Sequence, residues 1–124
     1  MFLRSIKFLH IFVKIFPMKV ILWLDDVRNP KDFIKDYDAN SVVWVKDYFG
    51  FVEFVNEGKL PDIVDFDHDL GEGRSGYDCA KYLVNWCIDN DARLPEIVIH
   101  SSNPVGKDNI ESLVNSYRKV YCQD

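Results

Sequence analysis

VILWLDD at residues 20–26 and DIVDFDHD at residues 62–69 are the most informative stretches of the sequence for its fold. Each is a mainly apolar run that ends in a group of acids, as expected for a buried strand that leads into a polar loop. SVVWV at residues 41–45 and LPEIVIH at residues 94–100 have the same apolar character. The sequence therefore predicts four strands.

The segments that follow the second, third and fourth strands begin with helix N-cap residues. These are Asp47, Ser75 and Asn103, and Ser75 begins an S-x-x-D pattern typical of a capping box. The helices are expected to end near residues 57 and 90, and the last one extends toward the C-terminus. Residues 27–40 contain Pro30 and several turn formers, so any helix there is short.

This alternation of strands and helices predicts an α/β fold with a three-layer sandwich. Right-handed crossovers between successive strands require a mainly parallel sheet, with helices on both faces. We expect the strand order 2-1-3-4. Only VYCQD follows the last predicted helix, so a fifth strand would be short or absent.

The 124 residues are enough for one domain, which we assign to residues 18–124. Residues 1–17 form an N-terminal extension with a charge of +3. It could be a surface-binding amphipathic peptide, an extra packed element, or translated sequence upstream of a start at Met18. Since the whole chain has a net charge of −5, residues 18–124 carry −8, and this acidic domain argues against general nucleic-acid binding. No signal peptide or membrane span is expected, and Cys79 and Cys87 are predicted as buried free thiols in a cytoplasmic protein.

Ionisable residues follow three of the four predicted strands, at the edge where ligands bind in parallel sheets. Two carboxylates about 4 Å apart repel each other by roughly 4 kcal/mol at an effective dielectric constant near 20, so such a cluster attracts protons or a cation. We predict that Asp25, Asp26 and Asp67 bind Mg²⁺ or Mn²⁺. Solvated loop acids and helix caps are the alternative. Asp65 lies on the same side of its strand as Asp67, and a structural role is as reasonable for it as a site role.

The histidines and the polar residues near these strand ends fit phosphoryl chemistry. We predict that His68 and His100 transfer protons, with Asp67 and Asp69 completing the catalytic group. Arg28, Ser101 and Ser102 are predicted to contact phosphate. The alternatives are structural histidines, a surface arginine paired with an acid, and simple helix capping by Asn103.

The motifs resemble those of two known groups of domains. LDD at residues 24–26 and PDIVDFD at residues 61–67 resemble receiver domains of two-component systems, which have a flavodoxin-like fold. By this resemblance Asp25 and Asp26 match the Mg²⁺-binding acidic pair, Asp67 the phosphoryl acceptor, and Ser101 or His100 the switch residue. LWLDDVRNP, FDHDLG, SGYDCAKYL and IHSSNPVG are more similar to the divergent cyclic-phosphate processing receiver domains, over residues 19–119.

The sequence and its resemblances lead to three functional hypotheses. The first is a metal-dependent phosphohydrolase that acts on cyclic phosphates, such as a 2′,3′-cyclic phosphate at an RNA end or in a small molecule. The second is a receiver-like switch or binding module in which Asp67 accepts a phosphoryl group. The lysine that ordinary receivers place at the end of a fifth strand has no clear match, since Lys119 precedes VYCQD. The third is a phosphatase of the haloacid dehalogenase type, because DFDHD resembles its D-x-D motif.

Overall fold

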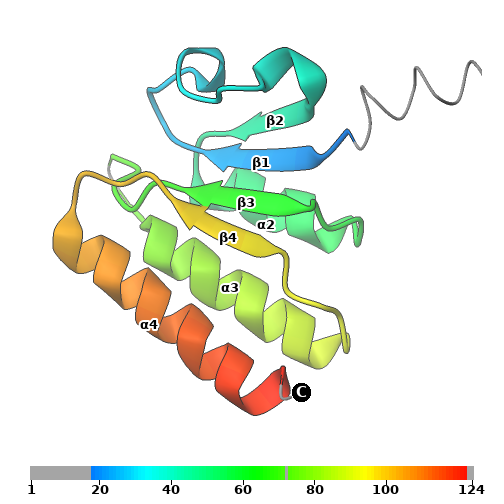
Figure 1. Ribbon diagram of the computed structural model, residues 1–124. Coiled ribbons are helices and arrows are strands. Elements are labelled where there is room, and N and C mark those ends of the chain that lie inside the picture. The colour runs from blue at the N-terminus through cyan, green and yellow to red at the C-terminus, as the bar shows by residue number, and fades with distance from the viewer. Residues whose placement is uncertain (1–17, 72, 123–124) are drawn as a thin grey trace, which may run out of the picture.

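The computed structural model describes residues 18–71 and 73–122, and the N-terminal extension lies outside them (Figure 1). The chain first forms β1 (Val20–Leu24) and two short 3₁₀ turns, η1 (Pro30–Asp32) and η2 (Tyr37–Ala39). The remaining elements are β2 (Ser41–Val45), α2 (Tyr48–Asn56), β3 (Ile63–Phe66), α3 (Gly76–Asp89), β4 (Glu96–Ile99) and α4 (Pro104–Tyr121).

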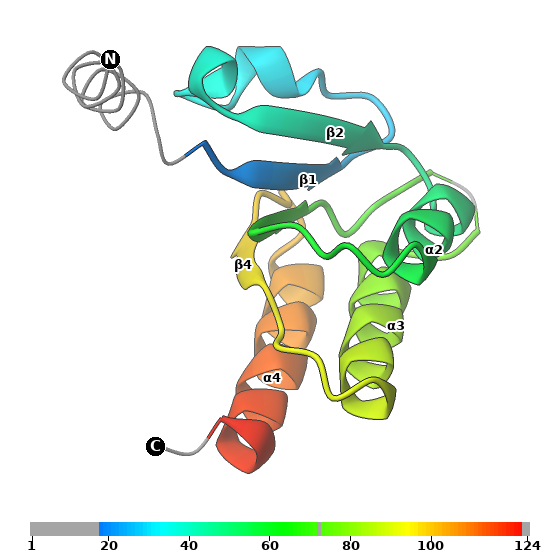
Figure 2. The same ribbon diagram turned by 90° about the vertical axis from the view of Figure 1, so that its right-hand side faces the viewer.

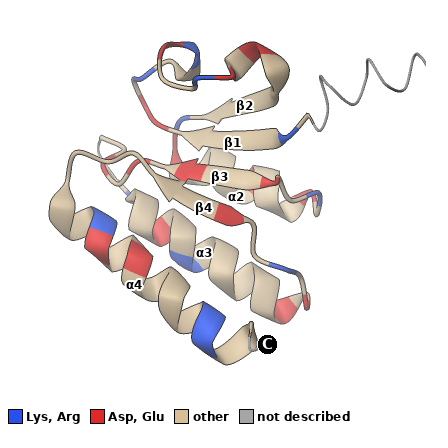
Figure 3. Cartoon of the chain, in the orientation of Figure 1, with Lys and Arg blue, Asp and Glu red and all other residues tan. Residues whose placement is uncertain are grey.

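The four strands form one parallel sheet in the order β2-β1-β3-β4, which confirms the predicted fold class and strand order. Leu24 is in register with Phe66, and Phe66 is in register with Ile99. The residues that follow these three, which are Asp25, Asp67 and His100, therefore leave the sheet side by side at its carboxyl edge. Acidic residues stand at the ends of β1 and β3 (Figure 3).

The distribution of the helices differs from the expected one. Within residues 18–71 and 73–122, all three α-helices pack on the face of the sheet that carries Leu22, Leu24, Val64 and Phe66 (Figure 2). The β1–β2 connection is the crossover on the opposite face of the sheet, and its only helical elements are the 3₁₀ turns η1 and η2. Asn29 caps η1 and Pro30 begins it, so this segment is short, as its turn formers predict.

The predicted N-caps are confirmed. Asp47 accepts a hydrogen bond from the N–H of Gly50, and Asn103 accepts one from the N–H of Gly106. Ser75 and Asp78 form a reciprocal capping box at the start of α3. Cys79 and Cys87 are buried free thiols on α3, as predicted. In the described part of the chain, no helix combines the length and the apolar character needed to cross a membrane.

Candidate metal and phosphate site

Asp25, Asp67 and His100 form the centre of the candidate site. Each offers one ligand atom, and these atoms lie within 4.8 Å of one another. Asp25 is fully buried and Asp67 is 5% exposed. All three residues follow in-register positions of β1, β3 and β4, so the parallel sheet itself brings them together. The side chains come from the face of the sheet opposite to the α-helices, near its carboxyl edge.

Hydrogen bonds fix the carboxylate of Asp25. Its Oδ1 accepts from the backbone N–H groups of Val27 (2.9 Å) and Arg28 (2.8 Å), which fold the chain back after β1. Its Oδ2 lies 2.9 Å from Nε2 of His100. Burial by itself would raise the pKa of the Asp25 carboxyl, but these donors together lower the pKa below its usual value. Asp25 is therefore an ionised carboxylate at neutral pH.

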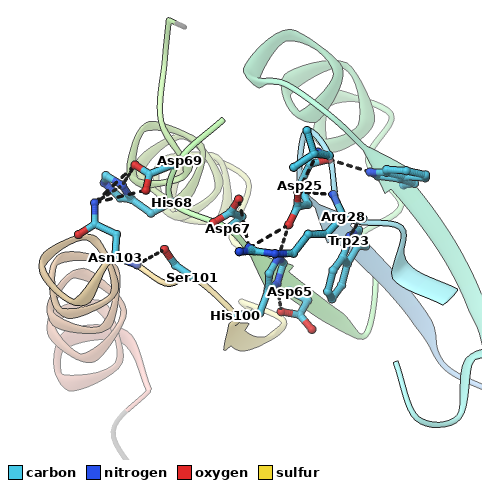
Figure 4. A network of polar contacts seen from close by, with 12 residues as sticks. Trp23, Asp25, Arg28, Asp65, Asp67, His68, Asp69, His100, Ser101 and Asn103 are labelled. Atoms are coloured by element: carbon cyan, nitrogen blue, oxygen red, sulfur yellow. Dashed lines mark hydrogen bonds and ion pairs between the residues drawn. The ribbon is translucent and has the colours of Figure 1, made fainter. Parts of the chain in front are cut away.

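His100 is held on three sides (Figure 4). Nδ1 lies 2.6 Å from Oδ1 of Asp65, Nε2 faces Asp25, and the ring stacks on Trp23 with 3.9 Å between centroids and 2° between planes. Burial lowers the pKa of the imidazole, but the bonds to Asp65 and Asp25 outweigh it and raise the pKa. A ring that donates from both nitrogens is an imidazolium, so without a bound cation His100 supplies a positive charge to the carboxylates.

Arg28 supplies the second positive charge. Its Nη1 lies 3.6 Å from Oδ2 of Asp25 and 3.9 Å from Oδ2 of Asp67. The pKa of the Asp67 carboxyl is raised, first by burial and then by repulsion from Asp25. His100, the N–H of Asp69 and Arg28 oppose this increase but do not cancel it. Asp67 is thus the carboxylate that gains most from an additional cation.

His68 belongs to a separate group. Its Nδ1 lies 3.0 Å from Oδ1 of Asp69 and 3.4 Å from Nδ2 of Asn103, and its ring packs against Gly106 at the start of α4. Within the described residues, the hydrogen bonds and ion pairs of the His68 side chain go to this group and not to Asp25, Asp67 or His100. In the view of Figure 4, Asp67 lies between the two groups. In this view, His68 and His100 lie on different sides of Asp67.

The other predicted residues lie around this edge. Oδ2 of Asp26 lies near Gly71 in the β3–α3 loop, and Asp26 is not one of the three clustered residues. Oγ of Ser101 accepts from the N–H of Asn103 at 3.0 Å, which leaves its O–H available as a donor. Ser102 is exposed.

The site has two further contributors: Asp65, for which the sequence leaves a structural and a site role equally open, and Trp23, which the sequence does not indicate. Strand alternation places Asp65 on the same side as Asp67, and this was the available signal. Trp23 has no such signal, because it stands in an apolar run typical of any core strand. Its Nε1 donates to the carbonyl of Arg28 at 2.9 Å, so it also holds the loop after β1.

The donors fit a divalent cation. Two buried carboxylates and one imidazole converge, and such oxygen and nitrogen donors bind divalent ions in proteins. With a neutral His100, the carboxylates of Asp25, Asp65 and Asp67 and the guanidinium of Arg28 sum to a charge of −2. A single divalent ion would neutralise this charge.

Comparisons with known proteins identify the family and the fold of the chain. The family model described as "cyclic-phosphate processing receiver domain" matches residues 20–116. No curated protein matches the chain.

Three solved structures are similar to the chain. A two-component response regulator of the LuxR family from Aurantimonas is 19% identical, with a TM-score of 0.55, over 85% of this chain and 86% of that one. The N-terminal domain of a response regulator/sensory box/GGDEF protein from Carboxydothermus hydrogenoformans is 21% identical, with a TM-score of 0.57, over 83% and 93%. A fusion that contains a trimeric coiled coil of yeast Spc42 is 26% identical, with a TM-score of 0.60, over 77% of this chain and 62% of the fusion.

Proposed function

We propose that this chain, which belongs to the family of cyclic-phosphate processing receiver domains, is a metal-dependent hydrolase that opens a cyclic phosphate. The proposed substrate is a small molecule or an RNA end that carries a 2′,3′-cyclic phosphate, and the proposed location is the cytoplasm. The convergence of Asp25, Asp67 and His100 at the carboxyl edge of the sheet is the observation that carries this proposal.

Asp25 and Asp67 are the proposed oxygen ligands of Mg²⁺ or Mn²⁺. When bound, such an ion supplies the Lewis acidity that polarises a phosphate and activates water at neutral pH. Burial of both carboxylates favours this role, because the loss of water strengthens their interaction with a cation. Asp26, near Gly71, would complete the acidic environment from the neighbouring loop.

The remaining side chains would bind the phosphate and move protons. The guanidinium of Arg28 is 36% exposed, so its fork can turn toward a phosphate that enters the site. The O–H of Ser101 can donate to the same phosphate, and Ser102 stands beside it. His68, oriented by Asp69, is the proposed proton-transfer group, and its removal should slow hydrolysis about 10²–10⁴-fold.

The test is to incubate the protein and Mg²⁺ or Mn²⁺ with an oligoribonucleotide that ends in a 2′,3′-cyclic phosphate. We expect a linear phosphomonoester product, and we expect its formation to stop in Asp67→Asn. Asp62→Asn is the matched control, because Asp62 precedes β3 and its carboxylate accepts from the N–H of Val20, at the end of the strand opposite to the site. Equal rates in Asp67→Asn and the wild type would refute the proposal.

A second candidate function is a phospho-acceptor switch. It is favoured by the position of Asp67 at the end of β3, beside buried Asp25, in a chain whose solved neighbours include response regulators. In this case Asp67 would be phosphorylated, and a partner would read the change.

A further inference from the structure

His100 has a geometry that simple charge neutralisation does not require. Its Nδ1 is occupied by Asp65, whose Oδ1 is 2.6 Å away, and both side chains are largely buried. The flat stack on Trp23 fixes the plane of the ring. With one nitrogen bonded and the plane fixed, Nε2 can point in only one direction, which is toward Asp25 and Asp67.

A carboxylate on one imidazole nitrogen is the arrangement that orients histidine ligands in metalloproteins. The carboxylate selects the tautomer in which Nδ1 carries the proton, and it leaves the Nε2 lone pair for the metal. Asp65, His100 and the cluster have this order. Trp23, at 1% exposure, shields one face of the His100 ring from water.

The separation of the ligand atoms is also suitable. Two ligands at right angles around an ion at about 2.1 Å are about 3.0 Å apart. Nε2 of His100 and Oδ2 of Asp25 are 2.9 Å apart, so both atoms could stay where they are while the ion replaces the proton between them.

We propose that Nε2 of His100 is a metal ligand positioned by Asp65 and Trp23, and that the site therefore prefers a transition metal such as Mn²⁺ or Co²⁺ to Mg²⁺. This ligand assignment depends on the proposed function only because both place the cation in the same site. An imidazole nitrogen suits transition metals, whereas Mg²⁺ selects oxygen ligands. Asp65 acts as a positioning residue through His100.

The test uses the purified chain with Mn²⁺ alone, without a substrate. Pulsed electron paramagnetic resonance of bound Mn²⁺ should detect coupling to an imidazole ¹⁴N in the wild type and in His68→Ala. The coupling should disappear in His100→Ala and in His100→Gln, which keeps a polar side chain in case alanine disturbs the fold. His68 is the matched control because it also follows a strand but lies outside the cluster.

Titration calorimetry gives a second readout. We expect Mn²⁺ and Co²⁺ to bind at least about tenfold more tightly than Mg²⁺, and Asp65→Asn to weaken Mn²⁺ binding about 10–100-fold. Absence of nitrogen coupling in the wild type, or equal affinities for Mn²⁺ and Mg²⁺, would overturn the inference and leave a hydrolase with oxygen ligands possible. Nitrogen coupling without any hydrolysis would instead refute the proposed function and retain the ligand assignment.

Discussion

Gly106→Ala should destabilise the protein through one contact, between α4 and the ring of His68. A Cβ atom at residue 106 would lie 2.5 Å from Cδ2 and 2.6 Å from Nδ1 of His68, and closer still to Cγ. Carbon atoms in good contact are about 3.5–4.0 Å apart, so the ring would have to move by about 1 Å. Since Cγ lies on the axis of rotation about the Cβ–Cγ bond, turning the ring about that bond cannot relieve the clash, and the whole side chain would have to move.

The expected cost follows from two opposing effects. Overpacking of this kind costs about 1–3 kcal/mol, while replacing glycine by alanine in a helix gains up to about 1 kcal/mol. The net loss in the free energy of unfolding should lie between about 0 and 3 kcal/mol, and we expect about 1–2 kcal/mol because the clash is severe, measured by urea denaturation. Hydrolysis should also fall, because the ring leaves Asp69 and Asn103, while Mn²⁺ affinity should stay unchanged.

Two comparisons isolate the contact. Gly50 occupies the same helical position in α2, and its N–H bonds to the cap residue Asp47. A Cβ there would meet Val45 Cγ1 at 3.2 Å, so Gly50→Ala should change stability by less than about 0.5 kcal/mol. In a His68→Ala background, Gly106→Ala should become neutral or stabilising. An equal cost in both backgrounds would mean that the helix end, and not the ring, determines it.

Three further predictions concern charge, thiol reactivity and phosphorylation. Arg28→Gln should tighten Mn²⁺ binding about 5–10-fold in calorimetry, because it removes a partly exposed cation beside two carboxylates. The same substitution should raise KM for the cyclic phosphate, and an unchanged metal affinity would contradict the prediction. Burial raises the pKa of Cys79 to about 12 and of Cys87 to about 11, so a disulfide reagent at pH 8 should modify only exposed Cys122 until the protein unfolds. Because unfolded thiols ionise near pH 9.0, the free energy of unfolding should decrease as the pH rises above that value, and no decrease would contradict the burial effect. Acetyl phosphate with Mg²⁺ should leave no durable adduct on Asp67, and a stable mass gain of one phosphoryl group would favour the switch.

The sheet was predictable because its signals are local. Apolar runs, N-caps and the handedness of crossovers determine four parallel strands and their order. The same rule places Asp25, Asp67 and His100 at one edge. The unequal distribution of the helices over the two faces was predictable only in part. Pro30 predicts that the β1–β2 connection is short, but the face that this connection covers depends on the direction of the β1–β2 crossover.

The pairing within the site was less predictable because it depends on contacts between distant residues. Asp65 and His100 are 35 positions apart, and strand alternation gives the face of Asp65 without giving its partner. His68 was expected to work with His100, but successive residues point to opposite sides, so a histidine next to Asp67 turns away from it toward α4. Register alone gives the positions of these residues and not the directions of their side chains.

The end of β4 also bears on the choice between enzyme and switch. A switch at this position needs a side chain that can move when Asp67 is modified. His100 is bonded on both nitrogens, to Asp65 and Asp25, and charge-assisted bonds of this kind contribute about 1.5–3 kcal/mol each. Movement of the ring would break both and would also separate it from Trp23. An enzyme benefits from the same rigidity, because donors fixed before the reaction need no reorganisation during it. The packing of His100 is therefore an argument for our proposal of a preorganised catalytic site, and a switch in this chain would need a moving residue other than His100.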